Sequence, residues 1–189
     1  MTREEAVALY KKYNSQENLW HHSLAVEAVM RRFARELGYD EEYWGVVGLL
    51  HDIDYEQYPD QHLQKAPAIL REAGVSEATI HSVLTHGWTI CTTVEPQHAM
   101  EKVLFTIDEL TGLITATALM RPSKSLLDLT LKSVKKKWKT KGFSAAVDRD
   151  LIARGAQMLG MDLDKVIELS IEGMRSVAKE LNLAGEEHS

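Results

Sequence analysis

The chain has 189 residues, 44% of them hydrophobic and 26% charged, with a formal net charge of −6. This length suits one well-buried domain and is short for two. The acidic balance argues against binding to nucleic acid polymers or acidic membranes, both of which favour a basic surface. A single cysteine excludes an internal disulfide, and no apolar run approaches the roughly 20 residues of a membrane span. With its polar N-terminus, the chain is expected to be cytoplasmic.

Nearly all local signals in the sequence are helical. Thr2 and Glu5 form the pattern of a capping box that opens a first helix, and Gly38 and Gly74 suit the ends of later helices. In chain order we expect helices over about 2–13, 18–37, 40–51, 62–73, 76–87 and 97–120, and two or three more after a break at 121–123, the last over about 162–181. No alternating strand pattern of useful length is present. The sequence therefore predicts an all-α single domain, residues 1–189, of about eight or nine helices.

The pair His51-Asp52 directly follows the apolar run over residues 44–50. A carboxylate at the end of a core-forming segment is costly unless an opposite charge neutralises it. A divalent metal does so, because imidazole nitrogen and carboxylate oxygen are ordinary ligands for zinc, iron and manganese. This pair is therefore a candidate for a metal site.

Two further residues are predicted to face the core together with this pair. Helical intervals from His22 reach the buried stripe of the second helix, whereas those from His21 reach a face that we expect to be more exposed. Asp108 lies within an apolar helix and also needs a partner. A lone inward histidine is more often a hydrogen-bonded core residue, and such an aspartate can cap a helix or pair with an arginine. As an ordered set on three helices, however, these residues favour a metal site.

The order His22, His51-Asp52 and Asp108, with the flanking strings around each, resembles the HD-domain superfamily of metal-dependent phosphohydrolases. It is similar in particular to small bacterial members of that superfamily, from about residue 15 to 175. The resemblance implies a helical bundle whose four motif residues hold a divalent transition metal, which could be Fe, Mn, Zn, Co or Ni. It also implies a metal-binding core over about 15–120. After this core, the local signals predict a helical extension over about 121–181 and a frayed tail over 182–189.

Two more histidines extend this resemblance to a second metal. His62 and His86 are similar to the pair that holds a second ion in the cyclic-dinucleotide phosphodiesterase branch, where the aspartate equivalent to Asp52 bridges both ions. The chain departs from that branch at Ala66, where a glycine is usual, and at 87–89, which lack its Gly-Tyr-Pro signature. The alternative is that both histidines are surface or capping residues. One or two ions are therefore expected, and cleavage of cyclic dinucleotides is not.

The chemistry that this resemblance implies is hydrolysis of a small phosphomonoester or phosphodiester of nucleotide type. A bound metal lowers the pKa of water to roughly 7, and a second can clamp the reacting oxygens. Asp52 and Asp54 are the candidate catalytic carboxylates, although Asp54 could instead support a ligand or cap the loop. Arg121, Lys135 and Lys136 are candidate contacts for substrate phosphate, with a solvated basic face as the alternative.

Two other functions are compatible with the same residues. A di-iron HD-fold oxygenase would use the same six ligands, and a non-catalytic metal-binding signalling module would keep the fold without turnover. The expected partner is a small-molecule phosphate ester, and the helices after Pro122 carry enough apolar positions to form a homodimer or to complete the monomer core. His81, His98 and His188 are interpreted as surface residues.

Overall fold

The computed structural model describes residues 1–185, so that His188 and the last four residues of the predicted tail lie outside the described residues. Within the described range there are nine α-helices, two short 3-10 helices and no sheet, which confirms the all-α prediction. The elements are α1 Arg3–Tyr13, α2 Glu17–Leu37, α3 Glu41–Leu50, η1 Pro59–Gln61, α4 Ala66–Glu72, α5 Glu77–Leu84, η2 Thr85–Gly87, α6 Ala99–Leu119, α7 Leu131–Trp138, α8 Arg149–Leu159 and α9 Leu163–Arg175. None of these helices has the length and apolar character needed to cross a bilayer.

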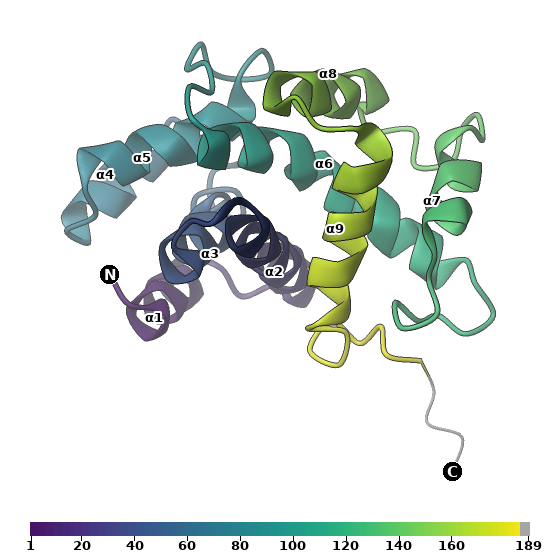
Figure 1. The fold of residues 1–189 in the computed structure, drawn as a ribbon. Coiled ribbons are helices and arrows are strands. Elements are labelled where there is room, and N and C mark those ends of the chain that lie inside the picture. Colours follow the sequence, from purple (N-terminus) through teal and green to yellow (C-terminus); the bar gives the residue numbers. More distant parts are fainter. Residues whose placement is uncertain (186–189) are drawn as a thin grey trace.

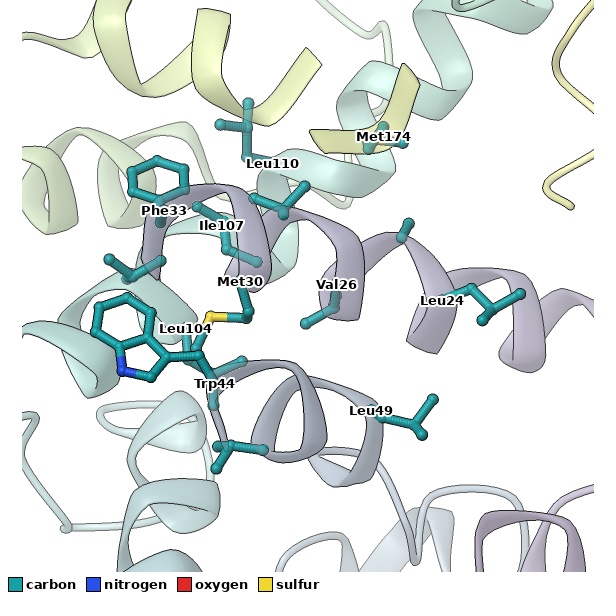
Figure 2. Packing of buried hydrophobic residues seen from close by; sticks show 14 of the residues in the cluster. Leu24, Val26, Met30, Phe33, Trp44, Leu49, Leu104, Ile107, Leu110 and Met174 are labelled. Carbon is teal, nitrogen blue, oxygen red and sulfur yellow. The ribbon is translucent and has the colours of Figure 1, made fainter. Parts of the chain in front are cut away.

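Helix α2 is central to the fold and packs against α3, α6 and α9 (Figure 1). Figure 2 shows Met30 of α2, Trp44 of α3 and Leu104 of α6 within the same buried cluster. Because neighbours cover α2 on several sides, Ala25 and Ala28 are also buried, at 2% and 6% exposure. The expectation that this face, which begins at His21, is more exposed was therefore wrong.

The ends of the first helices lie where local signals predicted them. Thr2 Oγ1 accepts a hydrogen bond from the Glu5 amide, and the Thr2 amide donates to the Glu5 carboxylate at 2.8 Å, which completes the capping box. Gly38 ends α2 in the left-handed conformation, with φ of 77°. Asp40 caps α3 through the Tyr43 amide at 3.1 Å.

The fourth helix begins at Ala66, four residues later than the expected start at His62. The reason is a long-range contact, because the carboxylate of Asp54 accepts hydrogen bonds from the amides of Lys65 and Ala66 and so caps the helix. Pro67 occupies the first turn, where its missing N–H is tolerated. His62 consequently lies in the connecting loop and not on the helix.

The C-terminal helix and tail also differ from the expectation. Helix α9 begins after Asp162 as predicted but ends at Arg175, and turns continue the chain to Asn182. The tail was predicted to fray from residue 182. Instead Leu183 is 4% exposed, and its carbonyl accepts a hydrogen bond from the Leu126 amide at 2.7 Å. Buried apolar contact and backbone pairing therefore hold this segment against the chain after α6.

A buried carboxylate connects α5 to the start of α6. Glu101, 1% exposed, accepts hydrogen bonds from His81 Nδ1 and Ser82 Oγ, both at 2.9 Å, and lies 3.1 Å from His98 Nε2. Burial alone would raise the pKa of this carboxyl, but the hydrogen bonds it accepts lower it below the ordinary value. This contact fixes α5 and with it the position of His86 in η2.

We predict that Gly173→Ala destabilises the protein, because α9 crosses α2 at this glycine. A Cβ there would lie 2.8 Å from Val29 Cα and 3.0 Å from the Ala28 carbonyl oxygen, and both are backbone atoms that cannot move aside cheaply. The expected loss in the free energy of unfolding is about 1–3 kcal/mol, measured by urea denaturation.

The matched control is Gly112→Ala in α6, where an added Cβ would meet nothing within 4 Å. Alanine favours helix over glycine by about 1 kcal/mol, so this variant should be as stable as the parent or more so. Equal stability of the two variants would contradict the close packing of α2 against α9.

Candidate metal centre

Three helices bring His22, His51, Asp52 and Asp108 to one point. His22 Nε2 lies 2.9 Å from Asp108 Oδ1 and 3.4 Å from Asp52 Oδ2. His51 Nε2 lies 3.2 Å from Asp52 Oδ2 and 3.3 Å from Asp108 Oδ1. We call these four residues the first ligand group. The donor atoms of His22, His51 and Asp108 lie close enough together to share one ion, and Asp52 Oδ2 lies within 3.4 Å of both histidines.

The two remaining candidate histidines lie on the other side of the same aspartate. The Nε2 atoms of His62 and His86 are each 3.3 Å from Asp52 Oδ1 and 3.1 Å from one another. We call His62, His86 and Asp52 the second ligand group. The Asp52 carboxylate therefore directs one oxygen to each group, as a ligand shared by two ions would.

The hydrogen bonds of the imidazole rings indicate that Nε2 atoms present lone pairs to these carboxylates. His51 Nδ1 lies 2.7 Å from the Gly48 carbonyl oxygen, and His86 Nδ1 lies 2.7 Å from that of Val83. A carbonyl can only accept, so each Nδ1 carries the proton, and Nε2 of a neutral ring is then an acceptor. Acceptors facing carboxylate oxygens are stable only with a cation between them. The donor set of imidazole and carboxylate fits a divalent transition metal.

Without a metal, proton binding supplies this positive charge. Burial disfavours a charged imidazole at His22, yet hydrogen bonds to Asp108 and Asp52 raise its pKa to about 9. Burial likewise opposes the charge on His51, but the same two carboxylates raise its pKa well above the ordinary value. Burial would raise the pKa of Asp52 and Asp108, and the neighbouring histidines lower both instead. The site is therefore built to hold positive charge among its ligands.

The individual ligands differ in their access to solvent. The side chains of His51 and His86 are 0% and 4% exposed, whereas those of His22 and Asp108 are 27% and 22% exposed. A small molecule can therefore approach the centre most easily from the side of His22 and Asp108.

Asp54 is fully buried, and both of its carboxylate oxygens are engaged. Oδ1 lies 2.9 Å from His62 Nδ1, and Oδ2 accepts from the Lys65 and Ala66 amides. Burial would raise the pKa of this carboxyl, but the contact with His62 and the amide hydrogen bonds lower it. The geometry makes Asp54 both the cap of α4 and the residue that orients His62. It offers no free oxygen for the proton transfer that the sequence suggested as one role.

The predicted phosphate contacts lie apart from the ligand groups. Arg121 and Lys135 form ion pairs with Asp128 and Asp164, at 2.7 and 2.6 Å, and Lys136 is exposed on α7. Arg121 follows the ligand aspartate of α6 by 13 residues, roughly 20 Å along the helix axis. Helix α7 packs against the C-terminal part of α6 (Figure 1). The structure does not support a role for these basic residues in binding phosphate at the centre.

Tyr55 is a neighbour of the centre that sequence reasoning did not single out. Its ring packs edge-on against His62, with centroids 5.1 Å apart, and its side chain is partly exposed. The only sequence signal is its position three residues after Asp52. His21, beside His22, points instead towards Glu17, at 3.7 Å.

Comparison with known proteins agrees with this geometry. The HD domain family model matches residues 19–132, which is more than half of the chain and includes all six residues of the two ligand groups. A search of curated proteins found no match, and neither did a search of solved structures. The resemblance predicted from the motif residues is therefore confirmed at the level of the family.

We predict two divalent ions per chain in protein purified without chelator, measured by elemental analysis. Asp52→Ala should lose both ions because both groups share this carboxylate, and His86→Ala should retain one. His21→Ala, beside a ligand but outside both groups, should keep two. Circular dichroism would verify that each variant is folded. Two ions in folded Asp52→Ala protein would remove Asp52 from the site.

We further predict that Asp54→Asn weakens binding of one ion only. An asparagine can still accept from the Ala66 amide, but its NH2 group would donate to His62 Nδ1 and move the ring proton to Nε2, which cannot then bind a metal. The affinity of the second ligand group for its ion should fall about 10–100-fold. Losses of this size are typical when a residue that hydrogen-bonds to a metal ligand is replaced. Calorimetric titration of the metal-free protein with Zn²⁺ or Mn²⁺ would measure this. Unchanged affinity at both sites would show that Asp54 only caps α4.

Proposed function

The chain belongs to the HD-domain family, and we propose that it is a metal-dependent phosphohydrolase that cleaves a small phosphomonoester or phosphodiester. Hydrolase activity is general in this family. The observation that carries the proposal is the Asp52 carboxylate, which directs one oxygen to each of two histidine-containing groups. Two ions held by these groups would suit the transfer of a phosphoryl group to water.

In this proposal the chain contributes a rigid set of ligands. His22, His51 and Asp108 would hold one ion, His62 and His86 would hold the other, and Asp52 would contact both. Bound divalent ions would supply an acidic water and neutralise charge on the phosphoryl oxygens.

The chain's own hydrogen bonds reduce the motion of these ligands. The rings of His51 and His86 are each fixed by a backbone carbonyl, and the ring of His62 is fixed by Asp54. Ligands already in position do not need to be ordered when substrate binds, so less free energy is lost. The exposed edge formed by His22 and Asp108 leaves one side of the centre open to substrate.

We predict metal-dependent release of phosphate or of nitrophenol by protein loaded with Mn²⁺, Fe²⁺ or Zn²⁺. A suitable panel holds p-nitrophenyl phosphate, bis(p-nitrophenyl) phosphate and nucleoside monophosphates. Asp52→Ala should lower kcat/KM by at least about 100-fold, because it removes the shared ligand. Lys136→Ala, at an exposed lysine of α7 outside both ligand groups, should keep the parental rate.

Oxygen consumption should be recorded in the same experiment, since a di-iron oxygenase would use the same six ligands. Protein that carries two ions but cleaves no ester of the panel would contradict the proposal. Oxygen uptake that requires two irons per chain would replace hydrolysis with oxidation. Folded protein that binds no metal under any of these conditions would instead indicate a non-catalytic module.

A further inference from the structure

A cavity of about 480 Å³ adjoins the open side of the metal centre. His22 belongs to both, because its ring forms part of the cavity wall while its Nε2 faces Asp108 and Asp52. The remaining walls come from α2, from the second half of α6 and from residues 181–183 after α9. A volume of this size is typical of sites for small organic ligands.

The residues that line this cavity are uncharged, apart from any proton on its two histidines. Ala25, Ala116, Leu119, Leu181 and Leu183 supply an apolar surface. Threonine and asparagine side chains add hydrogen-bonding groups, and the lining contains no aspartate, glutamate, lysine or arginine. Such a surface favours an uncharged organic group. A phosphate or carboxylate group in this cavity would lose its hydration without gaining a cation as partner.

Small residues on α6 keep this space open. An added Cβ at Gly112 would meet no atom within 4 Å, and Ala116 follows one turn later on the same side of the helix. The third wall is held in place by backbone hydrogen bonds. Leu183 donates to the Ala178 carbonyl at 2.8 Å and accepts from the Leu126 amide at 2.7 Å. Local sequence signals gave no indication of this wall, since the contact joins segments about 57 residues apart.

We propose that this cavity binds the uncharged organic group of a phosphate ester, such as a phenyl or nucleoside group, while its phosphate lies at the metal centre. The inference rests on the proposed function and narrows its substrate class. Such a cavity would select monoesters that carry one phosphate on an otherwise uncharged organic group. Nucleoside diphosphates, triphosphates and sugar bisphosphates are disfavoured, because their further charges would face an apolar wall.

The test compares phenyl phosphate with methyl phosphate, which share the reacting group but differ in the group that would occupy the cavity. Ala116→Phe fills the cavity, so kcat/KM for phenyl phosphate should fall at least 10-fold relative to that for methyl phosphate. The comparison is between variant and parent, so the intrinsic difference in reactivity of the two esters cancels. Ala68→Phe, at an exposed alanine of α4, is the matched control and should leave the ratio unchanged.

A binding measurement gives a second readout that needs no turnover. Calorimetry with the Mn²⁺-loaded protein should show phenylphosphonate binding at least 10-fold more tightly than methylphosphonate, and Ala116→Phe should remove this preference. If Ala116→Phe does not fold, Leu119→Glu serves the same purpose. Leu119 is 51% exposed, so a charge there is tolerated by the fold but would repel an apolar or anionic ligand at the rim.

The outcomes distinguish this inference from the proposed function. Hydrolysis of both esters at a ratio that neither variant changes would overturn the cavity as the binding site and leave the hydrolase intact. Hydrolysis of neither ester, with binding of neither phosphonate, would overturn the proposed function itself. Preferential loss of the phenyl compounds in Ala116→Phe, with methyl phosphate still cleaved, is the expected result.

Discussion

The carboxylate of Asp52 is the point around which the site is arranged, because four imidazole nitrogens lie within 3.4 Å of its two oxygens. Concentrating so many acceptor atoms in a largely buried position is unfavourable without a cation. Packing of apolar side chains supplies the free energy that holds them together. Met30, Trp44 and Leu104 pack between the same three helices that carry the first ligand group (Figure 2). The helical bundle therefore holds the histidines in place around the carboxylate that both ligand groups share.

Both ligand groups use the same local device to orient a histidine. His51 and His86 each lie just after the last turn of a short helix and approach the carbonyl three residues earlier, those of Gly48 and Val83. The last carbonyls of a helix lack partners within the helix, so this contact satisfies one of them while it fixes the ring. The remaining nitrogen then points away from the helix towards Asp52. The same hydrogen bond therefore satisfies a carbonyl at the end of the helix and orients the metal ligand.

The range over which each interaction acts along the chain explains how much could be predicted from the sequence. Capping residues and apolar periodicity act over a few residues. The helices and the inward direction of His22 and His51 could therefore be predicted from the sequence. The start of α4 could not, because it is set by Asp54, which lies twelve residues before Ala66 in the sequence. The position of Leu183 was missed for a similar reason, since its partner lies after α6. Contacts between distant segments leave no local pattern, and the errors fall where such contacts decide the structure.

One wall of the proposed substrate cavity comes from a part of the chain that carries no metal ligand. All six ligands lie within residues 19–132, the range that matches the HD domain, whereas residues 181–183 lie beyond it. The proposed substrate cavity and the metal centre share only His22. A substitution at Leu181 or Leu183 can therefore change the shape of the cavity without touching a ligand or its hydrogen-bonding partner. If the cavity binds the ester as proposed, residues 181–183 shape one wall of the binding site, while most of the other lining residues and all six ligands lie in the HD core.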